Sequence, residues 1–189
     1  GGTSSFSAVD SGYAGGLNDN MLRNPSFEVR GTVASNAYNW EWNTPDINGS
    51  FWGSATRVSW RHYPLEFGGW EGAICGSWAG MGTNGGFWQE ARAVPGRKYR
   101  FSAWLWADNG TDGIYWSAGE QAMKIEFMSG ASNGESYVET TNSPLSGINE
   151  TWQYRSLEGV APSGATWVRA VIYANNVGAS GALQCDDLR

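Results

Sequence analysis

The chain has 189 residues, with 12 Lys and Arg against 18 Asp and Glu, a net charge of −6 and a sequence pI near 4.7. This length fits one domain that can bury a core without metal or disulfide cross-links, and the acidic balance argues against a nucleic-acid partner, which calls for a basic patch. No apolar run approaches the ~20 residues that cross a bilayer, and residues 1–7 lack the basic and apolar regions of a signal peptide. We therefore expect no membrane partner, and a mature, soluble fragment of a longer protein.

Residues 1–20 are rich in Gly, Ser, Asn and Asp without an apolar period, which predicts a linker or a loosely docked tail. In residues 21–189, short strand-like runs alternate with Gly, Pro and Asn. About ten such runs, and no segment that keeps a helical apolar period over three turns, predict an all-β domain. The spacing favours a β-sandwich, jelly roll or barrel.

The first unusual segment, residues 36–63, holds four of the twelve Trp among turn-forming residues. Aromatic-rich loops on a rigid scaffold can wall a binding cleft. Trp52 in this segment and Trp116 in a later Gly-rich stretch are therefore candidate ligand contacts. The two cysteines, Cys75 and Cys185, fit a disulfide or two buried thiols equally well.

The run KYRFSAWLW, residues 98–106, has a clear period of two. Its odd-numbered residues are apolar and predict a side that faces the core, because successive side chains of a strand point to opposite faces. The other side carries Arg100, Ser102, Trp104 and Trp106. This mixture fits neither an oily core nor an ordinary solvated surface, and it predicts that both indoles project into water as a ligand platform.

Two later runs repeat this asymmetry. Lys124 and Glu126 alternate with apolar residues in AMKIEFM, and Arg169 and Tyr173 do so in WVRAVIYA. If these strands share one sheet with residues 98–106, their polar and aromatic side chains form a continuous surface. A sugar ring stacks its C–H face on indole or phenol rings and bonds its hydroxyls to Arg, Lys and Glu, so this surface predicts a polysaccharide ligand. The cations would equally suit the carboxylates or sulfates of an acidic glycan.

Four strings, taken in order, resemble the jelly-roll carbohydrate-binding modules of the family 4, 9, 16 and 22 type. They are NPSFE near the start, GGFWQEARAVPGRKYRFSAWLWA in the middle, TWQYRSLEGVAP after it and CDDL at the end. The middle string matches the family pattern at Gln89, Pro95, Gly96, Tyr99, Ser102 and Trp104. The resemblance covers nearly all of residues 21–189 and implies a jelly-roll β-sandwich of two antiparallel sheets with about ten strands.

The resemblance also implies a structural calcium ion that ties the first strand of the domain to the last. Carried over residue by residue, its ligands are Glu28, the carbonyl of Ser26, and Asp186 or Asp187. Calcium accepts six to eight oxygen ligands and mixes carboxylates with carbonyls, so it suits this set. The alternative is that these acidic residues are solvated strand ends, and residues 68–72 depart from the loop that usually supplies the other carbonyls.

Together, the residues and the resemblance predict a non-catalytic polysaccharide-binding module, monomeric when isolated, attached to a secreted bacterial glycan-degrading enzyme. The single histidine, His62, disfavours a nucleophilic triad or a zinc site. A two-carboxylate glycoside hydrolase or a polysaccharide lyase of jelly-roll form is the first alternative. A protein-binding adhesion sandwich is the second, and a flat patch of Trp without interleaved Arg and Glu would favour it.

Overall fold

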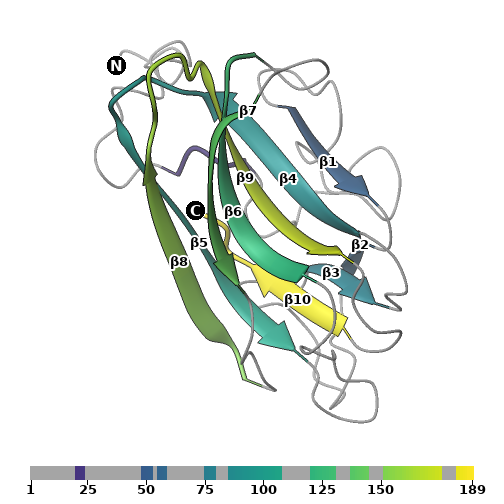
Figure 1. Ribbon diagram of the computed structural model, residues 1–189. Coiled ribbons are helices and arrows are strands. Elements are labelled where there is room, and N and C mark those ends of the chain that lie inside the picture. The colour runs from purple at the N-terminus through teal and green to yellow at the C-terminus, as the bar shows by residue number, and fades with distance from the viewer. Residues whose placement is uncertain are drawn as a thin grey trace, which may run out of the picture.

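Ten strands in two sheets make up the described part of the chain in this computed structural model (Figure 1). The structure describes residues 20–23, 48–52, 55–58, 75–79, 85–107, 120–130, 137–144, 151–175 and 182–189. All strand pairs in these ranges are antiparallel. The prediction of an all-β jelly-roll sandwich of about ten strands is confirmed. The described ranges contain no helix long and apolar enough to span a membrane.

The first sheet combines strands that are far apart in the sequence. Its order is β1 (Asn48–Trp52), β4 (Gly85–Arg92), β9 (Trp167–Asn175), β6 (Glu120–Met128) and β7 (Tyr137–Pro144). Only β6 and β7 are consecutive in the chain, so the other neighbours are joined by connections that cross between the sheets.

The second sheet packs behind the first (Figure 1). Its order is β2 (Ala55–Val58), β3 (Cys75–Ala79), β10 (Ala182–Asp186), β5 (Lys98–Ala107) and β8 (Gln153–Val160). The last strand of the chain, β10, therefore lies in the middle of this sheet, between β3 and β5.

The core lies between the two sheets and is filled by alternate residues of their strands. Phe87 of β4, Phe101 and Leu105 of β5, and Ile125 and Phe127 of β6 are at most 2% exposed. Burying an apolar side chain of this size stabilises the fold by about 1.5–3 kcal/mol. The predicted core sides of residues 98–106 and of AMKIEFM are thus confirmed.

The turn between β4 and β5 sets which residues of β5 face the core. Gly96 has a φ of 81°, in the left-handed region that glycine tolerates best. Its N–H donates to the carbonyl of Ala161 at 2.7 Å, and the hydroxyl of Tyr99 accepts the N–H of Val94 at 2.8 Å. The turn is therefore held against β8 and β5, and β5 enters the sandwich with Tyr99 pointing inward.

The described N-terminal segment, residues 20–23, is bonded to the body of the domain. Asn20 donates from Nδ2 to the carbonyl of Leu188 at 2.7 Å. Arg23 donates its N–H to Oε1 of the buried Gln89 at 2.6 Å, and Gln89 Nε2 donates to the carbonyl of Arg23 at 3.1 Å. The segment thus contacts both β4 and the last residues of the chain, while the division of the chain at residue 20 stays a prediction.

The last residues of the chain continue alongside β5 after β10 ends. The N–H of Ser102 donates to the carbonyl of Arg189 at 2.8 Å, and the N–H of Arg189 donates back at 2.9 Å. Leu188, the residue before Arg189, is fully buried and belongs to the core cluster. Asp187 has a φ of 48°, which marks the change of direction between β10 and this final pair.

The two sheets approach closely at Gly159 of β8, which leads to a first prediction. A Cβ atom at this position would lie 3.0 Å from Cε2 of Phe127 and 3.2 Å from Oγ1 of Thr141. Because both neighbours are held in the sandwich, Gly159→Ala should lower the free energy of unfolding by about 1–3 kcal/mol. Urea unfolding measures this, with Ser156→Ala at an exposed site of the same strand as the control. Equal stability of the two variants would contradict the close approach.

Candidate functional site

The two sheets separate residues that the sequence analysis had placed on one surface. Strand β5 belongs to the second sheet, whereas β6 and β9 belong to the first. The predicted continuous surface is therefore wrong. Alternation shows which side of a strand faces the core, but each sheet of a sandwich has its own outer side with the same alternation. The separated sets are Arg100, Trp104 and Trp106 on β5, and Lys124, Glu126, Arg169 and Tyr173 on β6 and β9.

The expected exposure of both β5 indoles is also wrong, because Trp106 is only 1% exposed. Gln184, which lies opposite Trp106 on β10, is 1% exposed as well, so this end of the outer side is covered. Trp104 is half-buried, and its ring meets that of Tyr154 edge to face with centroids 5.6 Å apart. The period of two correctly places both indoles on the side of β5 that faces away from the core. It does not show which other parts of the chain cover that outer side.

On the first sheet, Glu90, Arg169 and Glu126 stand side by side across three strands. The register pairs Glu90 with Arg169 and Arg169 with Glu126. Arg169 donates from Nη2 and Nε to Oε2 of Glu90 at 3.0 and 3.2 Å, and its Nη1 lies 3.6 Å from Oε2 of Glu126. We call these three residues the ion-pair row. Their side chains are at most 10% exposed, and buried charges of this kind persist only when they are paired.

Aromatic rings lie against the cations of this side of the sheet. The guanidinium carbon of Arg169 is 4.2 Å from the ring centroid of Trp88, and Nζ of Lys124 is 3.9 Å from that of Tyr173. Such contacts attract a cation to the face of the ring and fix both groups. We call this surface the first-sheet face; it consists of Trp88, Glu90, Lys124, Glu126, Arg169 and Tyr173.

The first-sheet face has a buried layer and a more accessible one. Arg169 and Tyr173 are at most 8% exposed, whereas Trp88 and Lys124 are half-buried. A ligand would therefore touch Trp88 and Lys124 first, while the more buried Arg169 supports Trp88 and the more buried Tyr173 supports Lys124. The face offers an indole, an ammonium group and carboxylates within one surface, which can hold a flat ring with apolar faces and a polar edge.

The outer side of the second sheet carries a different group of charges. Arg100 donates from Nε and Nη2 to Oε1 of Glu158 at 2.9 and 2.7 Å, and Lys98 donates to Oε2 at 3.2 Å. The hydrogen bonds from Arg100 and then Lys98 lower the pKa of Glu158, and the hydrogen bond to Glu158 raises the pKa of Arg100. These side chains are 38–65% exposed, so they are available to a ligand.

The expected calcium ligands are described only in part. Ser26 and Glu28 lie outside the described residues. Asp186 is fully buried and accepts the N–H of Asp187 at Oδ1, 2.7 Å away, while Asp187 accepts from Arg189 at 2.9 Å. Within the described ranges, no three His, Cys, Asp or Glu gather as a metal site.

Three further expected residues fall partly or wholly outside the described positions. Trp116 is not among them, and for Trp52 only the backbone of β1 is described. Cys185 is buried on β10, where the register places it opposite Gly76, the neighbour of Cys75 in β3. The side chain of Cys75 is not described, so the choice between a disulfide and two thiols stays open.

Four residues of the two outer sides were not anticipated as parts of a binding surface. In GGFWQEARAV, the period of two that assigned β5 also puts Trp88 and Glu90 on one side, opposite Phe87 and Gln89. The signal is therefore present in the sequence, in the same string that matches the family motif. Glu158 had no such signal, because its role comes from lying opposite Arg100 in the register. Tyr154 likewise gains its role from lying opposite Trp104.

No protein-family model matches the chain, and no curated protein sequence matches it. Among solved structures, a CBM4 structure aligns at 15% identity with a TM-score of 0.53, over 89% of this chain and 97% of that one. The enzymatically active domain of tailspike protein 4 from bacteriophage CBA120 aligns at 15% identity with a TM-score of 0.55, over 89% of this chain and 21% of that one. The arabinose-bound α-L-arabinofuranosidase MgGH51 aligns at 14% identity and a TM-score of 0.52, over 88% and 25%.

These alignments show a shared fold. The chain matches nearly the whole of the CBM4 structure but spans only about a fifth of the tailspike structure and a quarter of the arabinofuranosidase. The β-sandwich of this chain is therefore like that of a carbohydrate-binding module, and it also occurs as one part of larger proteins.

Proposed function

We propose that this chain is a non-catalytic carbohydrate-binding module, which binds a polysaccharide on the first-sheet face. The observation that supports this function best is the interleaving of rings and charges on that face: Trp88 lies on Arg169, and Tyr173 lies under Lys124. A pyranose needs both kinds of group, because its C–H face stacks on a ring while its hydroxyls need charged or amide partners.

The same interleaving argues against the adhesion alternative. A protein-binding patch is apolar at its centre and depleted of charged residues there. On the first-sheet face the central positions are Glu90, Arg169 and Glu126, which are charged and buried. The face therefore resembles a polar binding surface more than a protein interface.

The ion-pair row also argues against two-carboxylate hydrolysis at this place. Strands are about 4.8 Å apart, so the backbones of Glu90 and Glu126 are about 10 Å apart across Arg169. An inverting hydrolase separates its carboxyl groups by about 6.5–9.5 Å to admit a water molecule. Here the guanidinium of Arg169 fills that space. We infer that the row positions Trp88 rather than performing chemistry.

The proposal includes attachment to a larger, secreted glycan-active protein. The shared fold with a CBM4 structure supports the binding role, and the two larger neighbours, which contain this sandwich as about a fifth and a quarter of their length, support the role of an appended module. The parent protein would bring the polysaccharide to a catalytic domain, and the module would hold it there.

Affinity electrophoresis in gels that contain xylan, β-glucan, alginate or agarose tests the function. The chain should be retarded in at least one gel relative to a gel without polysaccharide. Retardation in none of them would overturn the proposed function.

We further propose a structural calcium ion held by Asp186 or Asp187 together with Glu28 and the carbonyl of Ser26. A buried carboxylate such as Asp186 needs hydrogen bonds or a cation to offset its desolvation, and the bond from Asn20 to Leu188 brings the start of the domain to the chain end. Glu28 follows Arg23 by five positions, and an extended chain of that length spans at most about 18 Å, so chain length allows Glu28 to take part in such a site.

Calcium removal gives a second prediction. A chelator should lower the melting temperature, because an ion bound only by the native state adds about 2.7 kcal/mol of stability at a hundredfold excess over its dissociation constant. Excess calcium should restore the original curve. Scanning calorimetry measures this, and Asp186→Asn should lose the response to chelator. A melting temperature that does not change in chelator would refute the proposed calcium ion.

A further inference from the structure

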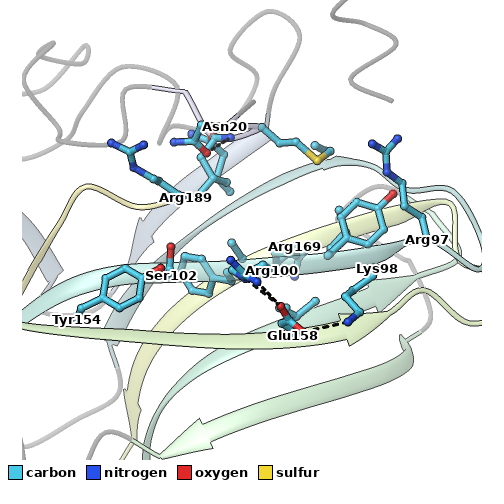
Figure 2. A pocket seen from close by; sticks show the side chains of 18 residues that line it. Asn20, Arg97, Lys98, Arg100, Ser102, Tyr154, Glu158, Arg169 and Arg189 are labelled. Atoms are coloured by element: carbon cyan, nitrogen blue, oxygen red, sulfur yellow. Dashed lines mark hydrogen bonds and ion pairs between the residues drawn. The ribbon is translucent and has the colours of Figure 1, made fainter. Parts of the chain in front are cut away.

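A pocket of about 710 Å³ opens between the N-terminal segment, the start of β5, β8 and the chain end. Its lining concentrates positive charge: five of the chain's twelve Lys and Arg contribute to it, namely Arg97, Lys98, Arg100, Arg169 and Arg189. In Figure 2, Arg97 and Arg189 stand at opposite ends of the pocket, and the bonded group of Arg100, Glu158 and Lys98 lies between them. We call this the basic pocket.

The pocket keeps a positive charge after its ion pairs are counted. Arg169 is compensated by the ion-pair row, and Arg189 by Asp187, at 2.9 and 3.1 Å. Among the described lining residues, Lys98 and Arg100 share the carboxylate of Glu158, which leaves 2 − 1 = +1 for this group. This local charge stands against a net charge of −6 for the whole chain. Such a patch attracts anions although the protein as a whole is acidic.

Arg100 has donors to offer an anion. Among the described residues, Glu158 takes two of its five N–H groups, and the side chain is 65% exposed. A guanidinium binds a carboxylate or sulfate through paired hydrogen bonds, which a lysine cannot match in geometry. Because hydrogen bonds from Arg100 and Lys98 lower the pKa of Glu158, that carboxylate stays ionised at neutral pH and competes with an incoming anion.

The pocket also offers an aromatic surface beside these cations. Tyr154 lines it, is 50% exposed and meets Trp104 edge to face. Tyr154 lies four residues along β8 from Glu158, about 13 Å away on an extended strand. A bare inorganic anion would use the cations alone, whereas a sugar that carries an anionic group would use both the ring and the cations.

We propose that the basic pocket is a second binding site, which takes a short stretch of an acidic polysaccharide whose units bear a carboxylate or a sulfate ester. Arg100 and Lys98 bind the anionic group of one unit, and Tyr154, about 13 Å along β8, stacks on another unit of the same stretch. The residues that would bind the ligand, Lys98, Arg100 and Tyr154, lie on the second sheet, and of the first-sheet face only Arg169 also lines the pocket, so this site depends on the proposed function only for the glycan nature of the ligand. It would let the module hold an acidic polysaccharide at two places.

Calorimetric titration with a matched pair of ligands tests this site. Trigalacturonate should bind, with an affinity that falls as salt is added, and its fully methyl-esterified form should bind at least about tenfold more weakly because the charge is gone. A sulfated galacto-oligosaccharide in a parallel titration shows whether the pocket prefers sulfate. Equal affinity for the acid and its methyl ester, or binding of neither the carboxylated nor the sulfated ligand, would overturn the proposal.

Two variants locate the binding in the pocket. Arg100→Ala should weaken the preferred acidic ligand by about tenfold or more, whereas Glu158→Gln should strengthen it several-fold by removing the competing carboxylate. Glu139→Gln on β7 changes the net charge by the same amount at an exposed site on the other sheet and is the matched control. Equal effects of Glu158→Gln and Glu139→Gln, or no effect of Arg100→Ala, would refute the site.

The two proposals fail in different ways. Retardation by a neutral xylan or β-glucan depends on the first-sheet face, so Arg100→Ala should leave it unchanged. If Arg100→Ala loses binding of the acidic ligand, and no neutral polysaccharide retards the unmodified protein, the result supports the pocket and counts against the first-sheet face. If a neutral polysaccharide retards the protein, and Arg100→Ala does not change the affinity for acidic ligands, the result supports the first-sheet face and refutes the basic pocket.

Discussion

Trp88→Ala should abolish retardation by whichever neutral polysaccharide the chain binds. The half-buried indole stands on the guanidinium of Arg169 and is the accessible ring of the first-sheet face. Removal of a Trp at the centre of a binding site commonly costs at least about 2 kcal/mol, which is about a 30-fold loss of affinity. Affinity electrophoresis over a series of polysaccharide concentrations measures this loss.

Two companion variants separate binding from folding. Trp88→Phe keeps a ring against Arg169 and should retain most of the affinity. Trp152→Ala removes a half-buried indole just before β8, in the second sheet, and should leave the retardation unchanged. Unchanged retardation of Trp88→Ala, with a normal melting temperature, would rule out the first-sheet face as the binding site.

Arg169→Met should be the most destabilising single change among the described charges. It leaves Glu90 and Glu126, which are 0 and 10% exposed at their side chains, without the cation that lies between them. Removal of one partner from a buried pair costs about 3–5 kcal/mol, because an uncompensated charge remains. Urea unfolding at neutral pH measures the change in free energy.

A charge-neutral variant shows whether the carboxylates cause this loss. Arg169→Met combined with Glu90→Gln and Glu126→Gln should recover a large part of the stability, since no buried charge is left. Arg100→Met breaks an ion pair that is largely exposed and should change stability little. If Arg169→Met cost no more than Arg100→Met, the ion-pair row would not be a significant part of the fold.

Most of the architecture could be predicted from local patterns. The period of two in residues 98–106 identified β5 and its core side, and turn residues between the runs marked the ends of the strands. The order of strands within the sheets could not be obtained in this way. Neighbours such as β4 and β9 are 75 residues apart from Arg92 to Trp167, and their pairing depends on the packing of the whole sandwich rather than on local sequence.

The binding surfaces were predicted in pieces and assembled incorrectly. Lys124, Glu126, Arg169 and Tyr173 were identified from alternation, and the structure does bring them together. The error was to join them to Trp104 and Trp106. A mixed polar and aromatic side is a property of one strand, whereas a surface needs the sheet assignment, which alternation does not contain.

The ion-pair row has a consequence for how the strands find their alignment. A slip of β9 by two residues against β4 would keep every side chain on its own side of the sheet, so apolar patterning cannot reject it. The slip would, however, set Val171 or Trp167 opposite Glu90 in place of Arg169. The buried carboxylate of Glu90 would then lose the cation that compensates its charge. The pairing of Glu90, Arg169 and Glu126 therefore favours the native register of β4, β9 and β6 over a register shifted by two residues.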